Sequence, residues 1–462
     1  MDDVPRTHKT INGLTWEGLT PGSEIWRLLD QERNLYYGKF FWENTGCWAD
    51  AGLLAISLHK HGQERHRMKG SATGIPTGGD FQRFGLEDFG FSTRFESDGP
   101  WGGRLAYGAE WHRESLNSGG YKFNSAGVKS TDLAQGPLAA DAHYNRYAFY
   151  LSDTFELGHW NIEPGIRFSS IEADLKRYYL KNSDPSTLQL SEKKNYQELI
   201  GSIRANKEFT PNNFVFFGLS QGFRPPSLYD LTSTDETSAV EHPNTSLDSE
   251  NFVQAEVGYK GSFHSWNWEA SYYHTWIKDM IVRSPVEAGK SDVLKANGDG
   301  YIQGLEIQVG YDWSITWRSE LSLSWMDSKV EQLLDHNAIG AIEINGRNYS
   351  SVNYPTTRLM PAQAHYVTRY TPFDAPWWAE ISILAAGKAD KLSLKDETDK
   401  SRIPADGTPA YALIGLHSGM NIGKHSAIFL GIENLNDSDY RVHGSGLNGS
   451  GRNFIFSFNS SF

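Results

Sequence analysis

The sequence predicts an all-β protein, an antiparallel transmembrane β-barrel of about seventeen strands. Many segments alternate apolar and polar side chains, and short and long connections follow one another along the chain. Aromatic residues make up 13% of the 462 residues although the mean hydropathy is -0.52. A period of two places one face of a strand against an apolar medium and the other in water. Because a barrel in lipid also needs aromatic girdles, the apolar medium is interpreted as hydrocarbon.

The strands are expected wherever this alternation is clear. The last ten residues show it best, with Phe454, Phe456, Phe458 and Phe462 at alternate positions separated mostly by Asn and Ser. Further segments with the same alternation are 253–260, 305–312 and 321–325. The first recognisable strand lies near 34–43, and the stretch 22–35 is compatible with one short helix.

The connections between these strands fall into two classes. The short connections are 156–159, 210–213, 261–264, 371–375 and 421–424. The long connections are 61–86, 113–143, 172–195, 224–250, 284–300, 328–357, 388–407 and 434–451. Tryptophans flank the short class, as expected of one interfacial girdle: Trp101, Trp160, Trp266, Trp313 and Trp377. Short periplasmic turns and long external loops are typical of bacterial outer-membrane barrels.

Composition excludes several other classes of protein. No run approaches the roughly 18 apolar residues that a spanning helix requires. The net charge of -13 argues against a nucleic-acid partner. Cys47 is the single cysteine and cannot form an internal disulfide. The alternative fold is a soluble β-propeller or sandwich whose Trp and Tyr side chains bind carbohydrate.

The N-terminal segment predicts a chain that lacks its true start. Residues 1–10 have no basic region followed by an apolar region, so no secretory signal is present. Counting back from Phe462, the strand at 34–43 descends toward the periplasm, and an odd strand number leaves an unpaired edge in hydrocarbon. We therefore expect residues 1–33 to be the remnant of an external loop and residues 34–462 to be an N-terminally truncated barrel.

Two boxes flank the connection 224–250 and resemble those of TonB-dependent outer-membrane receptors. The first box is Phe223-Arg224-Pro225-Pro226, and the second contains His242-Pro243-Asn244, Leu247 and Glu250. Three further stretches are similar to the same family: 297–306, 431–441 with Asn434, and the terminal strand with its closing Phe462. The order of these pieces matches the family from about residue 30 to the end.

This resemblance implies a fold and a set of partners. The family's barrel has 22 strands, so about seventeen strands here correspond to strands six to 22. The implied function is uptake of a large scarce nutrient such as haem, a ferric siderophore or a cobalamin, driven by the TonB complex through a plug that this sequence does not contain. Lipopolysaccharide, the barrel-assembly machinery and an extracellular small-molecule ligand are the other implied partners. No cofactor is expected beyond haem or a ferric chelate as transported ligand.

Arg224, Tyr229 and His242 are the candidate ligand-binding residues. Arg224 stands at the external end of a strand, where Pro225 and Pro226 remove two backbone donors. The alternative interpretation of Arg224 is a rigid strand terminus. His242 lies in the interval where, by resemblance, haem-importing members place an iron ligand, and its alternative interpretation is a solvated loop histidine.

A histidine cluster and a glycine-rich segment are not expected to form metal or phosphate sites. His59 and His61 share one face of a strand, but the neighbouring Lys60, Arg65 and Arg67 disfavour a bound cation, so no metal site is expected with His66 or elsewhere. The glycine-rich segment 444–451 lacks the Lys-Ser or Lys-Thr of a phosphate-binding loop. No catalytic motif is present, so the chain is not expected to be an enzyme. A passive, plugless channel or an adhesive barrel is the alternative function.

Overall fold

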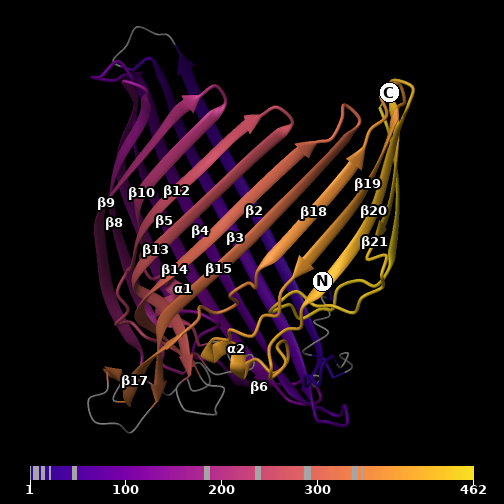
Figure 1. Ribbon diagram of the computed structural model, residues 1–462. Coiled ribbons are helices and arrows are strands. Elements are labelled where there is room, and N and C mark those ends of the chain that lie inside the picture. Colours follow the sequence, from indigo (N-terminus) through magenta and orange to yellow (C-terminus); the bar gives the residue numbers. More distant parts are fainter. Residues whose placement is uncertain are drawn as a thin grey trace.

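The protein folds as one antiparallel sheet that curls round on itself, so that β2, β3 and β4 pass behind β14, β15 and β18 (Figure 1). The computed structural model describes residues 2–3, 10–11, 16–19, 22–43, 49–181, 188–234, 241–285, 293–335, 342–344 and 347–461. Cys47 and Phe462 lie outside these residues.

Seventeen long strands form the wall of the sheet within the described residues. They are β2 (Glu24–Glu43), β3 (Ala51–Gly70), β4 (Pro76–Asp98), β5 (Arg104–Phe123), β7 (Asp141–Leu157), β8 (Trp160–Tyr178), β9 (Leu190–Thr210), β10 (Asn213–Arg224), β12 (Glu250–Phe263), β13 (Trp266–Pro285), β14 (Val293–Asp312), β15 (Trp317–Asp335), β18 (Gln363–Tyr370), β19 (Trp377–Ala386), β20 (Tyr411–Ile422), β21 (Ser426–Glu433) and β22 (Asn453–Ser460). The remaining elements lie outside this consecutive series: β1 (Asp2–Asp3), β6 (Lys129–Asp132), α1 (Leu228–Thr232), β11 (Glu241–His242), β16 (Ile342–Ile344), β17 (Arg347–Tyr354) and α2 (Leu394–Thr398).

Each long strand pairs with the long strand that follows it along the chain. The order runs without a crossover from the β2–β3 pair to the β21–β22 pair, and every one of these pairings is antiparallel. An up-and-down sheet of this kind satisfies backbone hydrogen bonds between neighbours, which is what a wall in hydrocarbon requires. The predicted all-β antiparallel barrel fold and its strand number are confirmed.

The two ends of the sheet differ. At one end the strands join through short turns such as residues 158–159, 211–212 and 264–265; we call this the turn end. The opposite end, which we call the loop end, bears α1, α2, β6 and β17, at the bottom of Figure 1. From the β4–β5 connection onward, short and long connections alternate as predicted, whereas the β3–β4 connection at the loop end is only residues 71–75.

Several predictions about strand extent are wrong, because paired strands also enter the predicted connections 113–143, 172–195, 284–300 and 328–357. Segment 22–35 is not helical but belongs to β2, which begins ten residues before the expected strand at 34. The segment 61–86 is not a long loop, because β3 and β4 stay paired as far as Gly70 and Pro76. Strands of up to 23 residues exceed the roughly ten that cross a bilayer, so they continue as paired hairpins in water, where the apolar alternation that marked their inner parts is lost.

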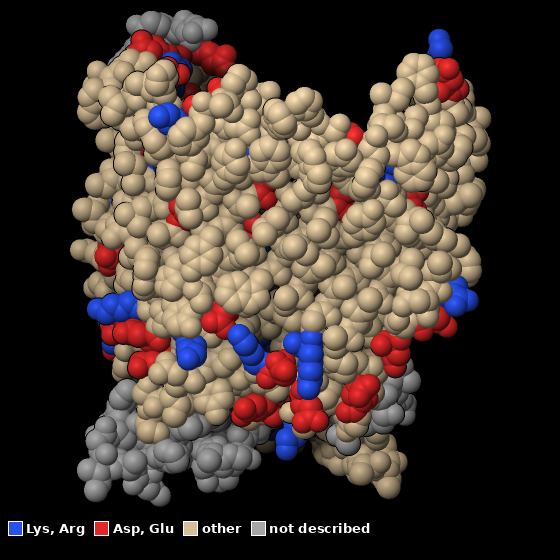
Figure 2. Space-filling model, in the orientation of Figure 1, with Lys and Arg blue, Asp and Glu red and all other residues tan. Residues whose placement is uncertain are grey.

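The outward face of the sheet is apolar. Phe454, Phe456 and Phe458 expose 71%, 68% and 56% of their surface, and on β14 Leu305 is exposed on the same face as Ile307 and Val309. Figure 2 shows a broad, mostly uncharged belt across the middle of the molecule, with most Lys, Arg, Asp and Glu side chains of this face below it at the loop end and others at the upper rim. None of the helices in the described residues is long and apolar enough to cross a bilayer.

Buried side chains concentrate at the loop end rather than in the middle of the sheet. The largest cluster joins Tyr144 of β7 and Leu175 of β8 to Leu228 and Leu231 of α1. The connection between β10 and β12 therefore folds back onto the neighbouring strands, which fixes the position of its polar residues.

Candidate ligand-binding site at the loop end

The connection between β10 and β12 begins with a short capped helix. Pro225 and Pro226 end β10, and Pro226 is fully buried, where its carbonyl oxygen accepts a hydrogen bond of 3.0 Å from the hydroxyl of Tyr144. Ser227 caps α1 through its hydroxyl, which accepts from the backbone N–H of Asp230, while the Asp230 carboxylate accepts from the backbone N–H of Ser227. This reciprocal capping box fixes where the chain turns after the first sequence box.

Arg224 holds the two ends of this connection together. Its Nη2 donates to Oε1 of Glu250 at 2.6 Å, and its Nη1 donates to Oδ2 of Asp230 at 2.8 Å. Arg224 and Glu250 face each other in the β10–β12 register, so the pair closes the base of the connection, and the backbone N–H of Ile281 adds a 2.7 Å bond to Glu250. Three guanidinium nitrogens of Arg224 donate hydrogen bonds to the carboxylates of Glu250 and Asp230. These bonds fasten the start of the connection to its end, and we call them the Arg224 latch.

Lys295 of β14 lies under α1 and is 6% exposed. Its ammonium nitrogen donates to the carbonyl oxygen of Tyr229 at 2.9 Å and to the hydroxyl of Ser233 at 2.7 Å. The same nitrogen lies 3.7 Å from Oε2 of Glu241 and 4.0 Å from Oδ1 of Asp230. Burial lowers the pKa of Lys295 to about 7, the Asp230 carboxylate opposes this shift, and Arg283 and Arg224 reinforce it.

Lys295 lies outside the part of β14 that faces lipid. The outward apolar run of β14 begins near Leu305, ten residues further along the strand. At roughly 3.3 Å per residue this places Lys295 about 30 Å from Leu305 along an extended strand. The Lys295 cluster is therefore in the aqueous loop region.

Glu241 and His242 form β11, which pairs in parallel with Val293 and Leu294 of β14. Glu241 is 4% exposed; it accepts a 2.9 Å hydrogen bond from the hydroxyl of Tyr229 and forms an ion pair with Arg283. His242 is half-buried beside it. The structure thus brings Tyr229 and His242 to one side of β14, while Arg224 reaches the same cluster through Asp230.

The other residues of the second box complete the folded connection. The side-chain amide of Asn244 donates to the carbonyl oxygen of Lys295 at 2.9 Å, and its Oδ1 accepts from the backbone N–H of Ser246. Leu247 is 3% exposed in the loop-end core that Phe223 also contacts. The two boxes therefore meet in space, as expected of neighbouring strand ends.

A second capped helix lies near this cluster. Ser393 caps α2 through a box with Asp396, whose side chain is fully buried. Arg358 forms ion pairs with Asp396 at 3.0 Å and with Asp399 at 2.5 Å. Burial lowers the pKa of Lys395, and Arg283 reinforces this shift. Because Arg283 also pairs with Glu241, the two capped connections adjoin each other.

The remaining predicted residues have structural contacts or lie elsewhere. Asn434 is 4% exposed and donates to the carbonyl oxygens of Ser438 and Ser450, both at 2.9 Å, which ties down the glycine-rich connection. His59 and His61 stack with an interplanar angle of 3°, but Arg33 donates to Nε2 of His59 at 3.0 Å. Within the described residues no group of three or more His, Cys, Asp or Glu side chains is placed to hold a metal ion.

Sequence reasoning missed Lys295, Asp230 and Glu241. Lys295 belongs to no motif, and it reaches the cluster from β14, two strands beyond the β10–β12 connection. Glu241 directly precedes the second box but matches none of its positions. The one available signal was the spacing of Ser227 and Asp230, which is that of a capping box.

The fold and this site define a large antiparallel barrel of the membrane type, with a loop end covered by latched connections. A family model described as TonB dependent receptor-like, beta-barrel matches residues 6–435. The chain belongs to the TonB-dependent receptor β-barrel family, whose members are transporters rather than enzymes. None of the curated proteins matches the sequence.

Solved structures share the fold at low sequence identity. The copper transporter OprC aligns with a TM-score of 0.75 and 16% identity, covering 94% of this chain and 66% of its own. The siderophore receptor PiuA from Acinetobacter baumannii gives 0.66 and 15%, covering 94% and 64%. A double mutant of the Serratia marcescens hemophore receptor HasR, in complex with its hemophore and heme, gives 0.70 and 13%, covering 94% and 66%. The chain thus spans slightly less than two thirds of each of these structures.

Proposed function

We propose that this chain is the barrel of a receptor in the bacterial outer membrane that takes up a large scarce nutrient by a TonB-dependent route. The nutrient belongs to one of three classes: haem, a ferric siderophore or a cobalamin. Proteins of similar fold include a copper transporter, a siderophore receptor and a hemophore receptor in complex with heme, which supports a metal-containing ligand. The whole receptor engages TonB through a plug domain, and the barrel-assembly machinery inserts it.

The observation that carries this proposal is the latched connection between β10 and β12. Arg224 joins it to Glu250 at its base, and Lys295 joins α1 to β14, so the described residues 225–234 and 241–249 are held at the loop end. Tyr229 exposes 39% of its surface although its carbonyl and hydroxyl groups are both bound. A pre-organised surface with an exposed aromatic ring binds a large ligand with little loss of conformational entropy.

Uptake in the native host tests the proposal. The full-length gene is deleted and restored in a strain with TonB and in a strain lacking TonB, and uptake of labelled haem, ferric chelates and cobalamin is measured. The expected result is uptake of one ligand that requires both the gene and TonB. Unchanged uptake without TonB overturns the proposal and favours a passive channel, which steady ion conductance of the purified protein in a planar bilayer then identifies.

His242 is our candidate axial ligand if the transported molecule is haem. Neutral imidazole is a common iron ligand, and His242 directly follows Glu241, which accepts a hydrogen bond from the hydroxyl of the exposed Tyr229. The full-length receptor is titrated with haem, and the visible absorption of the complex is compared with that of His242→Ala. His159→Ala, at an exposed histidine of the turn end, is the matched control. Loss of the ligated spectrum only in His242→Ala supports the assignment, and an unchanged spectrum removes it.

A further inference from the structure

A groove opens on the outward face where β15 changes partner. β17 pairs with β15 from Val330 onward and β18 pairs with it up to Ser324, so residues 325–329 have no ladder partner on that side. Between these two partners the chain leaves the sheet at residues 355–362. The gap is a direct result of this break in pairing.

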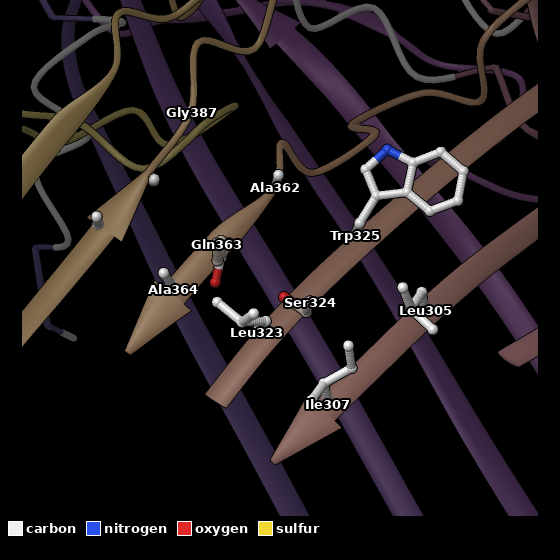
Figure 3. A pocket seen from close by; sticks show the side chains of 11 residues that line it. Leu305, Ile307, Leu323, Ser324, Trp325, Ala362, Gln363, Ala364 and Gly387 are labelled. Atoms are coloured by element: carbon white, nitrogen blue, oxygen red, sulfur yellow. The ribbon is translucent and has the colours of Figure 1, made fainter. Parts of the chain in front are cut away.

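Small side chains widen the gap into a cavity of about 510 Å³. One side presents Ala362, Ala364, Ala385, Ala386 and Gly387, and the other presents Leu305, Ile307, Leu323 and Trp325. We call this cavity the alanine groove. Figure 3 shows the long side chains of Leu305, Ile307 and Leu323 projecting from β14 and β15, whereas Ala362 and Ala364 present only methyl groups. Lipid chains rather than protein side chains are therefore the natural filling of this space.

The alanine groove is continuous with a polar pocket toward the loop end. A second cavity of about 150 Å³ shares Trp325 and Ala362 with the groove and is lined further by Lys388, Asp390 and Lys391. An apolar groove in the lipid-facing belt therefore leads directly to charged side chains at the membrane surface.

Lys388, Asp390 and Lys391 line this opening, and Asp327 and Lys329 of β15 continue the charged region toward the loop end. We call these five side chains the lysine rim. Lys391 donates to Oδ1 of Asp327 at 2.6 Å, and Asp327 also accepts from the hydroxyl of Tyr301 at 3.3 Å. Lys329 shares the outward face of β15 with Trp325 and Asp327, because alternate residues of a strand share a face. The members are Lys329, Lys388, Lys391, Asp327 and Asp390, with a formal charge of one positive unit.

Lys388 is the cation of the rim that a head group reaches most directly. It is exposed and lines the polar pocket, and it forms no ion pair with another residue of the described part of the chain. A lysine beside a membrane surface attracts anionic lipid. Its long side chain can keep its ammonium group in water while its methylene groups cover apolar surface.

We infer that the alanine groove and the lysine rim together bind one molecule of lipopolysaccharide, with an acyl chain of its lipid A part in the groove and a lipid A phosphate on Lys388 and Lys329. This inference rests on the proposed placement in the outer membrane, where the loop end faces the leaflet that contains this lipid. The groove supplies dispersion contacts that a flat wall lacks, and the rim selects a phosphate-bearing head group.

A second outward groove provides a matched control. It has a comparable volume of about 580 Å³ and is lined by apolar residues including Phe217, Leu219, Ala255 and Val257, without a lysine among its lining residues. Ala255 and Ala364 are both small lipid-facing residues within a strand. An Ala→Trp substitution fills either groove with the same side chain, but only the alanine groove adjoins the lysine rim.

The experiment measures lipid A retained by the purified full-length receptor. Wild type, Ala364→Trp, Lys388→Glu and Ala255→Trp are extracted in mild detergent, their folding is checked by the heat-dependent gel shift of an intact barrel, and bound lipid is quantified by native mass spectrometry. We expect Lys388→Glu to lower retention about fivefold or more. Ala364→Trp is expected to lower it at least as much, and Ala255→Trp to leave it unchanged.

Titration of delipidated protein separates the contributions of chain and phosphate. Lipid A with two phosphates should bind wild type more tightly than lipid A with one, and this difference should shrink in Lys388→Glu. The inference is overturned if wild type and Ala364→Trp retain equal amounts of lipid A, or if Ala255→Trp loses as much lipid A as Ala364→Trp. It is also overturned if wild type retains phosphatidylglycerol in preference to lipid A. Nutrient uptake is measured separately, so failure of the lipid site leaves the proposed transport function untouched.

Discussion

The ammonium nitrogen of Lys295 lies 3.7 Å from the centre of the Tyr229 ring. This cation–π contact joins β14 to α1, and the same nitrogen donates to the carbonyl oxygen of Tyr229. Lys295 therefore binds the backbone and the ring of one residue of the β10–β12 connection. Because burial lowers the pKa of this amine, the closed loop disfavours its charged form, and the stability of the loop depends on pH.

The first prediction concerns this pH dependence. The pKa of Lys295 is about 7 in the folded protein and 10.5 ordinarily. Between these values the opened loop binds a proton that the closed loop does not, so the free energy of local opening rises with pH. The rise is at most about 1.4 kcal/mol per pH unit. It is absent below pH 7, where both states are protonated. Hydrogen exchange of residues 228–234 measures it.

Two variants control this measurement. Lys295→Met removes the titrating group, so the opening free energy of α1 should lose its rise between pH 7 and 10.5. Lys388→Met removes an exposed lysine far along the chain from α1 and should leave the slope as it is in wild type. A slope that persists in Lys295→Met shows that another group is responsible.

The second prediction concerns the Arg224 latch. Arg224→Ala leaves the buried carboxylates of Glu250 and Asp230 without their shared cation. We expect local opening of residues 225–249 to become easier by about 2 kcal/mol, since hydrogen bonds to charged groups contribute that much. Limited proteolysis and hydrogen exchange of this connection measure the change.

Arg318→Ala serves as the comparison for the latch. Arg318 pairs with Asp312 at 3.5 Å at the turn end, and both side chains are about half exposed. Exposed pairs of this kind contribute under about 1 kcal/mol. Opening of residues 225–249 should not change in this variant, and equal opening in both variants would show that the latch has no local role.

The strands were predictable where one face meets lipid and the other meets water. Leu305, Ile307 and Val309 alternate with polar residues for this reason. The pattern fails beyond the belt, for example at Gln63-Glu64-Arg65 of β3, because both faces of the hairpin are polar there and periodicity no longer separates strand from loop. Strand extent therefore requires pairing information that a single sequence does not contain.

Only the contacts between consecutive strands of the site were predictable from the sequence. Arg224 and Glu250 end and begin consecutive strands, so their proximity follows from an up-and-down sheet. Lys295 and Tyr229 are 66 positions apart in the sequence, and their contact accompanies the pairing of β11 with β14. Neither residue belongs to a local pattern that marks this pairing in advance, so the buried lysine was not predicted.

The third prediction tests a turn that the sequence did mark. Asn212 has a φ of 67° between β9 and β10, a left-handed conformation that asparagine and glycine tolerate. Asn212→Ala should lower the free energy of unfolding by about 1 kcal/mol, whereas Asn212→Gly should be nearly neutral. Urea unfolding of the receptor in lipid vesicles compares them, and equal values for the two variants contradict the backbone explanation.

The fourth prediction concerns Asn434, which combines a φ of 48° with three hydrogen bonds inside the connection 434–452. Asn434→Gly keeps the backbone conformation but removes the three bonds, and should ease local opening of the connection by about 2 kcal/mol. Asn434→Ala adds the strain of a left-handed alanine, about 1 kcal/mol more.

Hydrogen exchange of residues 438–450 separates these two effects. Ser438 donates its backbone N–H to Oδ1 of Asn434, so its exchange should accelerate in both variants, and more in Asn434→Ala. Asn434→Asp keeps this acceptor but loses the two donated bonds to Ser438 and Ser450. Because its carboxylate faces the two carbonyl oxygens with no proton to donate, its effect should be at least as large as that of Asn434→Gly. Exchange that is equally fast in all three variants would show that side-chain size, rather than hydrogen bonding, holds this connection.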